Sequence, residues 1–116
     1  KRFNPLLGEN TMAKNVIPVD QSSFQKMVID SDLPVLVDFS ATWCGPCRMI
    51  EPLLEDVAGT RSDDVRVVKV DIDTNKQLTH EYQVRSVPTL MLFSNGQRVK
   101  THVGIINRDA LEKFIS

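Results

Sequence analysis

The sequence predicts an α/β fold, a mixed central β-sheet flanked by helices on both faces. A nearly continuous apolar run at residues 34–39 is typical of a strand that is covered on both sides. Apolar residues recur at three- and four-residue steps through residues 48–58, which indicates an amphipathic helix. Two further apolar runs are joined through Asn95-Gly96, a pair that favours a tight hairpin. With 116 residues, 41% of them hydrophobic, the chain has the size of one compact domain.

The N-terminal half begins with a predicted short strand at residues 16–19. Asp20 or Ser22 can cap a helix that continues through Ile29. The central strand at residues 34–39 follows, and after it comes the amphipathic helix. This succession predicts a βαβα arrangement.

The C-terminal half begins with a valine-rich run at residues 65–72, which predicts a strand. Asn75 is placed to cap a short helix that ends near Tyr82. The strands of the hairpin are expected at residues 89–93 and 99–103, and they should be antiparallel.

A last helix should begin after Asn107, a residue suited to the N-cap, because the apolar side chains that follow it make one stripe. The complete order is βαβαβαββα, which implies a mixed sheet with helices on both faces.

Composition excludes several function classes. The formal net charge is −1 and the basic residues are scattered, so the chain lacks the electrostatic footprint of a nucleic-acid-binding protein. No apolar run approaches the roughly 18 residues of a membrane span, so no membrane association is expected. Met12 resembles a natural start, and residues 1–11 are therefore interpreted as an extension, a tag or leader remnant, before a domain at residues 12–116.

The chain has two cysteines, Cys44 and Cys47, within the stretch Trp-Cys-Gly-Pro-Cys at residues 43–47. Three interpretations are open: a redox dithiol, half of a metal site, or a static structural disulfide. A closed zinc site needs four ligands, and the remaining candidates, His80 and His102, are isolated in sequence. A static disulfide would close a very short loop and constrain the unfolded chain little. Redox chemistry is therefore the favoured interpretation, with no cofactor and no metal.

The position of the cysteines between a strand and a helix suggests their roles. At a helix N-terminus, Cys44 would meet unpaired backbone N–H groups that stabilise its thiolate. Cys47, about one turn into the helix, should be more buried and less reactive. The hypothesis is that Cys44 attacks a substrate disulfide and Cys47 then resolves the mixed disulfide.

The stretch at residues 43–47, together with Ser86-Val87-Pro88-Thr89 before the hairpin, closely resembles the thioredoxin family. The resemblance extends from about Val16 to the C-terminus, and it includes four further positions in the family's order: Asp38, Pro52, Lys69 and Gly104. One departure is Ser40, where many bacterial members carry a second tryptophan. The Gly45-Pro46 pair resembles that of the reducing members rather than the oxidising ones.

The resemblance implies a thioredoxin fold and a protein disulfide reductase. Its partners would be disulfide-containing proteins and a thioredoxin reductase that draws electrons from NADPH or ferredoxin.

Asp38 lies in an otherwise apolar strand, where desolvation should raise its pKa. The resemblance favours a proton acceptor for Cys47 during resolution, and the alternative is an aspartate at a solvated strand end. Lys69 is either the ionic partner of Asp38 or a surface lysine.

The resemblance also implies a cis Val87-Pro88 bond facing the cysteines, which would leave the Val87 backbone free to pair with an extended substrate segment. The alternative is a proline that merely opens the next strand. The expected docking rim comprises Trp43, Gly45, Pro46, Ile72, Val87, Pro88 and Gly104 to Ile105.

Two other functions remain open: a binding module whose thiols are incidental, and an oxidase or isomerase of an oxidising compartment. A monomer is expected. A cytoplasmic location is expected because a CxxC pair alone does not resemble a cysteine-dense secreted domain, with an organelle after leader removal as the alternative.

Overall fold

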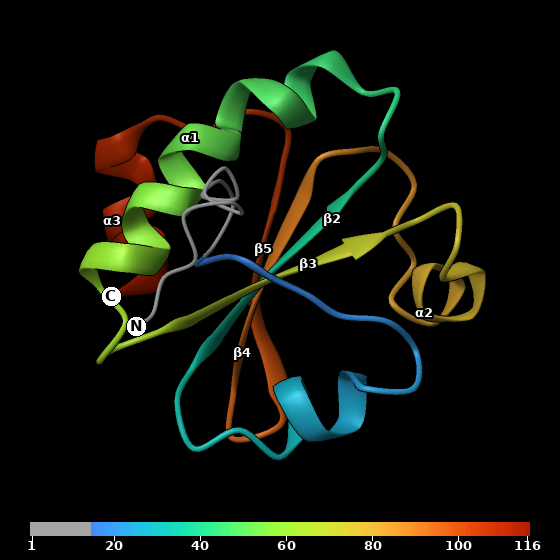
Figure 1. The fold of residues 1–116 in the computed structure, drawn as a ribbon, viewed down its shortest axis with the longest axis horizontal. Coiled ribbons are helices and arrows are strands. Elements are labelled where there is room, and N and C mark those ends of the chain that lie inside the picture. Colours follow the sequence, from blue (N-terminus) through green and yellow to red (C-terminus); the bar gives the residue numbers. More distant parts are fainter. Residues whose placement is uncertain (1–14) are drawn as a thin grey trace, which may run out of the picture.

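The computed structural model describes residues 15–116, and its centre is a five-stranded sheet in the order β1-β3-β2-β4-β5 (Figure 1). β1 pairs with β3 and β3 with β2 in parallel, whereas β2–β4 and β4–β5 are antiparallel. The predicted mixed sheet is confirmed. The elements are β1 (Ile17–Pro18), η2 (Gln25–Ile29), β2 (Val35–Ser40), α1 (Gly45–Thr60), β3 (Arg66–Asp71), α2 (Lys76–Glu81), β4 (Thr89–Ser94), β5 (Gln97–Val103) and α3 (Arg108–Ile115).

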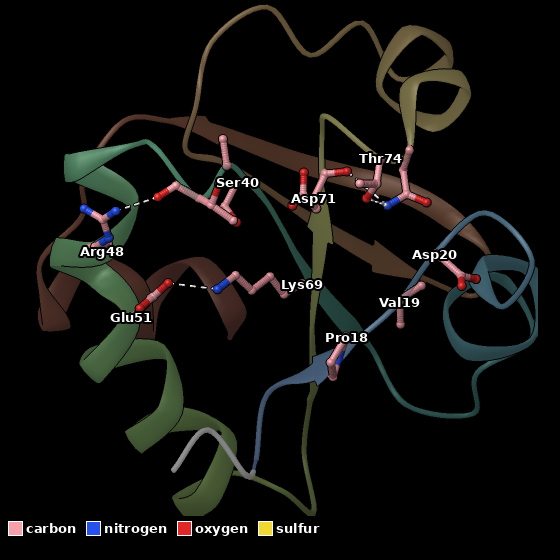
Figure 2. Close-up of a pocket in the computed structure, with 12 residues that line it drawn as sticks. Pro18, Val19, Asp20, Ser40, Arg48, Glu51, Lys69, Asp71 and Thr74 are labelled. Atoms are coloured by element: carbon pink, nitrogen blue, oxygen red, sulfur yellow. Dashed lines mark hydrogen bonds and ion pairs between the residues drawn. The ribbon is translucent and has the colours of Figure 1, made fainter.

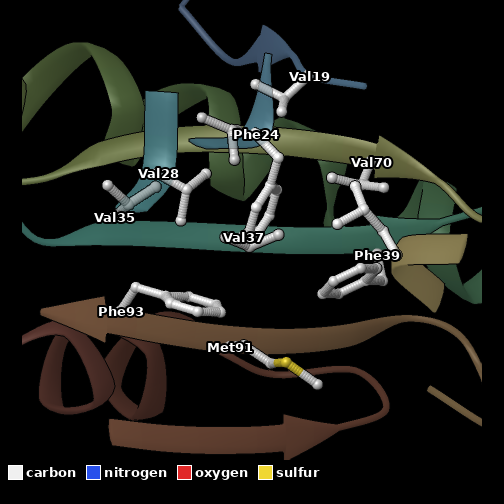
Figure 3. Packing of buried hydrophobic residues seen from close by; sticks show 11 residues of the cluster. Val19, Phe24, Val28, Val35, Val37, Phe39, Val70, Met91 and Phe93 are labelled. Carbon is white, nitrogen blue, oxygen red and sulfur yellow. The ribbon is translucent and has the colours of Figure 1, made fainter. Parts of the chain in front are cut away.

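Helices cover both faces of the sheet, as predicted (Figure 1). On one face, α1 and α3 pack on Leu36, Val67 and Leu90 in a cluster that also includes Leu54 and Leu111. Alternate strand residues point to the opposite face, where η2 and α2 complete a second cluster. Figure 3 shows part of that second cluster: Val19, Phe24, Val28, Val35, Val37, Phe39, Val70, Met91 and Phe93.

The first strand and helix differ from the prediction in detail. β1 has only two residues, Ile17 and Pro18, and the Val19 N–H beyond it still reaches the Lys69 carbonyl at 2.9 Å. The Pro18 nitrogen faces the open edge of the sheet, where a proline leaves no ladder hydrogen bond unmade. The helix that ends at Ile29, as predicted, is a π-helix. Asp20 holds the turn before it by accepting the N–H groups of Ser22 and Ser23, each at 3.0 Å.

The predicted Asn75 cap is wrong at the side-chain level. Asn75 occupies the N-cap position of α2, but its side chain makes no capping bond and accepts the Gln21 N–H at 2.9 Å instead. The Gln21 side chain accepts the N–H groups of Gln77 and Leu78, at 2.8 and 3.3 Å. A residue distant in sequence therefore caps α2.

The hairpin and the last cap are confirmed. Asn95 and Gly96 have positive φ values of 53° and 81°, as a tight turn between β4 and β5 requires. β5 begins two residues earlier than expected, at Gln97. Asn107 accepts the Ala110 N–H at 2.8 Å, which satisfies a free donor in the first turn of α3.

The candidate site forms where β2 ends and α1 begins. β2 ends at Ser40, and α1 begins at Gly45 and continues past Pro52 to Thr60. The long helix therefore starts earlier than the periodicity indicates, because Pro46 is well suited to the first helical turn, where its missing N–H costs nothing.

Candidate active site

Cys44 and Cys47 form a disulfide across the first turn of α1, with their Cα atoms 5.3 Å apart. Cys44 is the N-cap residue in an extended conformation, and its Sγ accepts the Cys47 N–H at 3.1 Å. Both residues are buried, with 4% of Cys44 and 1% of Cys47 exposed. The first turn of the helix thus directs a backbone donor at one of the two sulfur atoms, the arrangement that stabilises a thiolate.

The segment before β4 faces this disulfide. The Val87-Pro88 peptide bond is cis, as the sequence led us to expect, and the Val87 carbonyl oxygen lies 3.8 Å from Cys44 Sγ. The Gly104 N–H donates to the Pro88 carbonyl at 2.9 Å, which ties the end of β5 to the same segment. Within residues 15–116, the Val87 N–H has no hydrogen-bond acceptor.

Apolar side chains surround the cysteines. Ile72 and Val87, both half-buried, pack against the cluster of Ala41, Cys44 and Cys47. Trp43 and Ile105 are 64% and 55% exposed. The predicted rim therefore contains both packed and exposed members, and Gly45 and Pro46 are exposed beside them.

Trp43 has a hydrogen-bond partner that the sequence did not predict. Its indole N–H donates to Asp73 Oδ2 at 2.8 Å. The two residues are 30 positions apart, and no local pattern in the sequence links them.

Asp38 is buried in β2, with 1% of its surface exposed, so the alternative of a solvated strand end is wrong. Its Oδ1 atom has no hydrogen-bond partner among the described residues. Burial raises the pKa of Asp38 from 3.8 to about 7; the positive charge of Lys69 lowers this pKa, and the negative charge of Glu51 raises it. A carboxyl group with such a pKa can exchange a proton near neutral pH.

Lys69 lies beside Asp38 in the parallel β2–β3 register, but its ion pair is with another residue. Lys69 Nζ lies 2.8 Å from Glu51 Oε2, so Lys69 acts on Asp38 through its charge and not through an ion pair. Figure 2 shows this pair reaching from β3 to α1 along the wall of a pocket. Glu51 was not among the site residues predicted from the sequence, although its position one turn after Cys47 on the helix was a usable signal.

Two other features bear on the kind of chemistry. Within residues 15–116, no group of three or more His, Cys, Asp or Glu side chains is arranged to hold a metal ion. In the same part of the chain, no helix combines the length and the apolar character needed to cross a membrane.

Comparison with known proteins agrees with this geometry. Residues 15–116 match the thioredoxin family. The chain is 45% identical over 105 residues to a thioredoxin of Rickettsia felis, an alignment that covers 90% of this chain and 97% of that protein. It is 48% identical over 93 residues to thioredoxin 1 of Synechococcus elongatus, covering 80% and 87% of the two chains. It is 49% identical over 100 residues to a thioredoxin of Mycobacterium bovis, covering 86% of each chain.

These matches span nearly all of the described residues, and the Cys-x-x-Cys pair is already closed at disulfide distance in the structure. The chain therefore belongs to the thioredoxin family, and it is a thiol-disulfide oxidoreductase that reduces protein disulfides.

Proposed function

We propose that Cys44 is the attacking nucleophile of this reductase, that Cys47 is the resolving thiol, and that Asp38 accepts the Cys47 proton. The observation that carries the proposal is the hydrogen bond from the Cys47 N–H to Cys44 Sγ at the first turn of α1. A hydrogen bond to sulfur favours the thiolate over the thiol, and the thiolate is the form that attacks a disulfide.

The exchange proceeds in two balanced steps. The Cys44 thiolate attacks one sulfur of the substrate disulfide, forms a mixed disulfide and expels the other substrate sulfur as a thiolate. Cys47 then loses its proton, and its thiolate attacks Cys44 Sγ, which releases the second substrate sulfur. The substrate gains two electrons, and its two sulfurs leave as thiolates that take up protons from water. The Cys47 proton passes to Asp38, and this chain is left with the Cys44–Cys47 disulfide that the structure contains.

Asp38 suits the proton transfer in the second step because of its burial. A buried carboxylate with an unpartnered oxygen is a stronger base than one in water, since desolvation disfavours its charge. Its pKa of about 7 lets it accept a proton at neutral pH and later release it. Lys69 is assigned a supporting electrostatic role.

The docking surface is proposed to be the rim around the disulfide. An extended substrate segment can pair with the free Val87 N–H, while its side chains contact the exposed faces of Trp43 and Ile105. Gly45, Pro46, Ile72 and Gly104 complete this surface, and Pro88 lies buried behind it, where it forms the cis bond with Val87. The 3.8 Å from the Val87 carbonyl oxygen to Cys44 Sγ would bring the bound segment close to the attacking sulfur.

The remaining parts of the proposal concern the cellular setting. A thioredoxin reductase supplies the two electrons that reopen the Cys44–Cys47 disulfide, so that the chain acts as a monomeric electron carrier. A reducing compartment, the cytoplasm, suits a chain with two cysteines, both in the redox pair. Analytical ultracentrifugation of the oxidised protein at two concentrations tests whether it is a monomer, through the molar mass in solution.

Trapping tests the order of attack. Reduced Cys47→Ser protein should form a stable mixed disulfide with protein substrates, because the resolving thiol is missing, whereas Cys44→Ser protein should form none. Adducts trapped equally by both variants, or by neither, would contradict the assignment.

The alternative function, a binding module whose thiols are incidental, is tested by replacing both Cys44 and Cys47 with serine. The reductase loses all disulfide reduction, whereas a binding module keeps its activity.

A further inference from the structure

We propose that Glu51 is a positioning residue for disulfide exchange: by holding the Lys69 ammonium group in an ion pair, it keeps the buried Asp38 carboxyl free to take up the Cys47 proton. This inference rests on the proposed role of Asp38 and extends it to a residue on α1.

The contacts place Lys69 between two carboxyl groups. Lys69 pairs with Asp38 in the parallel register of β2 and β3, so the two side chains leave the sheet on the same face. The Lys69 ammonium nevertheless binds Glu51 Oε2 at 2.8 Å, and Asp38 Oδ1 is left without a partner among residues 15–116. Two carboxyl groups lie near one ammonium group, and the one on α1 forms the ion pair.

A pocket of about 430 Å³ connects these groups, and Asp38, Glu51 and Lys69 all line it. The other charged group on this pocket is Glu55, also from α1, while the uncharged Val16 and Pro18 line it from the segment around β1. A second pocket, which Glu51 and Lys69 also line, carries Arg48, Asp71 and Asp20 (Figure 2). The Glu51–Lys69 pair therefore lines both pockets, whereas Asp38 lines only the first.

The charges act on Asp38 in opposite directions. An ammonium group bound directly to Asp38 would stabilise its carboxylate and make it a weaker base. Glu51 reduces this effect in two ways, because it binds the ammonium group and adds a negative charge that raises the pKa of Asp38. Without Glu51, the Asp38 carboxylate would be more stable and would take up a proton from Cys47 less readily.

Glu51→Gln tests the inference, with Glu55→Gln as the matched control. Both residues lie on α1 and line the same pocket, but Glu55 accepts the N–H groups of Asn15 and Val16, each at 3.0 Å, and does not bind Lys69. The readout is the pKa of Asp38, followed by carboxyl-carbon NMR in the oxidised protein, where the cysteines do not titrate. We expect Glu51→Gln to lower this pKa by roughly half a unit to one unit, and Glu55→Gln to leave it unchanged.

A second variant distinguishes two ways in which Glu51 could affect the Asp38 pKa: by binding the Lys69 ammonium group, or by its own negative charge alone. In a Lys69→Gln background, the effect of Glu51→Gln on the Asp38 pKa should shrink, because the ammonium group that Glu51 holds is gone. An effect of the same size in both backgrounds, or no effect in the native background, would overturn the inference.

Enzyme kinetics separates this inference from the proposed function. With a protein disulfide substrate, Glu51→Gln should move the pH profile of the exchange rate to lower pH without changing KM, since Glu51 lies outside the docking rim. If Asp38→Asn protein keeps the native rate at every pH, the base role of Asp38 is wrong. If Asp38→Asn is impaired while Glu51→Gln leaves the Asp38 titration unchanged, only the inference about Glu51 is wrong.

Discussion

The Cys47 N–H group points at the Sγ atom of Cys44, 3.1 Å away. The two cysteines therefore differ chemically although they share one helical turn, because only Cys44 accepts a hydrogen bond from the N-terminal turn of α1. This asymmetry leads to a prediction about reactivity.

Reduced Cys44 should be alkylated at pH 7 faster than reduced Cys47, by roughly tenfold or more, because its thiolate is stabilised at the helix N-terminus. The measurement is the iodoacetamide rate of two single-thiol proteins, Cys47→Ser and Cys44→Ser. Each variant serves as the control for the other. Equal rates would show that the N–H group gives Cys44 no advantage.

The contribution of Asp38 to the stability of the oxidised protein should fall as pH rises from about 4 to about 7. The folded pKa of Asp38 is raised from 3.8 to about 7, so in this range the folded state holds a proton that the unfolded state has lost. By linkage, the stabilising contribution of Asp38 is fully present below its pKa in the unfolded state. It is lost as the pH rises through its pKa in the folded state, and the total loss is on the order of 4 kcal/mol. Asp38→Asn protein lacks this titration and should keep a flatter profile.

Urea unfolding of the native protein and of Asp38→Asn at pH 5 and pH 8 measures the effect. The difference between their free energies of unfolding should shift in favour of Asp38→Asn at the higher pH. Comparing the variant with itself at two pH values removes the cost of its buried amide from the result. A difference that does not vary with pH would contradict the raised pKa.

Gln21 and Asn75 connect the chain before η2 to the start of α2, and their loss should cost different amounts. Asn75 is 4% exposed and accepts the Gln21 N–H, so Asn75→Ala should destabilise the protein by about 1–3 kcal/mol through an unsatisfied donor. Gln21→Ala removes the side-chain cap of α2 and should cost about 0.5–2 kcal/mol. Because the residues are in contact, the double variant should cost less than the sum of the two. Strict additivity, measured by urea unfolding, would contradict this coupling.

Gly96→Ala should destabilise the β4–β5 hairpin, by about 1–3 kcal/mol. Gly96 has a φ of 81°, and an added Cβ would lie 3.2 Å from the Ile29 carbonyl oxygen. The neighbouring Asn95→Gly is the control: φ is 53° there, and glycine adopts this conformation without strain. Thermal unfolding of the two variants provides the comparison, and equal melting temperatures would contradict the steric argument.

Much of the fold could be predicted because its signals are local. Covered strands such as β2 appear as nearly continuous apolar runs, and the amphipathic helices appear as stripes. The Asn95-Gly96 turn follows from the φ values that these two residues tolerate. Element ends were less predictable, because hydrogen bonding, and not the apolar pattern, sets where β1 and β5 begin and end.

The candidate site also has features that local sequence predicts and features that depend on packing. The two cysteines and their place at the start of a helix are visible in five consecutive residues. Asp38 could be singled out because a carboxyl group in an apolar strand is costly unless it has a purpose or a partner. The sequence could not show whether Lys69 forms an ion pair with Asp38 or with Glu51. This depends on how α1 packs over β3.

By itself, the sequence determined the order of the elements, the redox pair and the buried carboxyl group, since these depend on residue type and short-range spacing. Only the tertiary structure decided which charged groups bind each other and which residue caps α2, and that the Val87 N–H has no acceptor among residues 15–116. These contacts join residues that are far apart in sequence. Their geometry depends on how the helices pack on the sheet, and no local pattern encodes it.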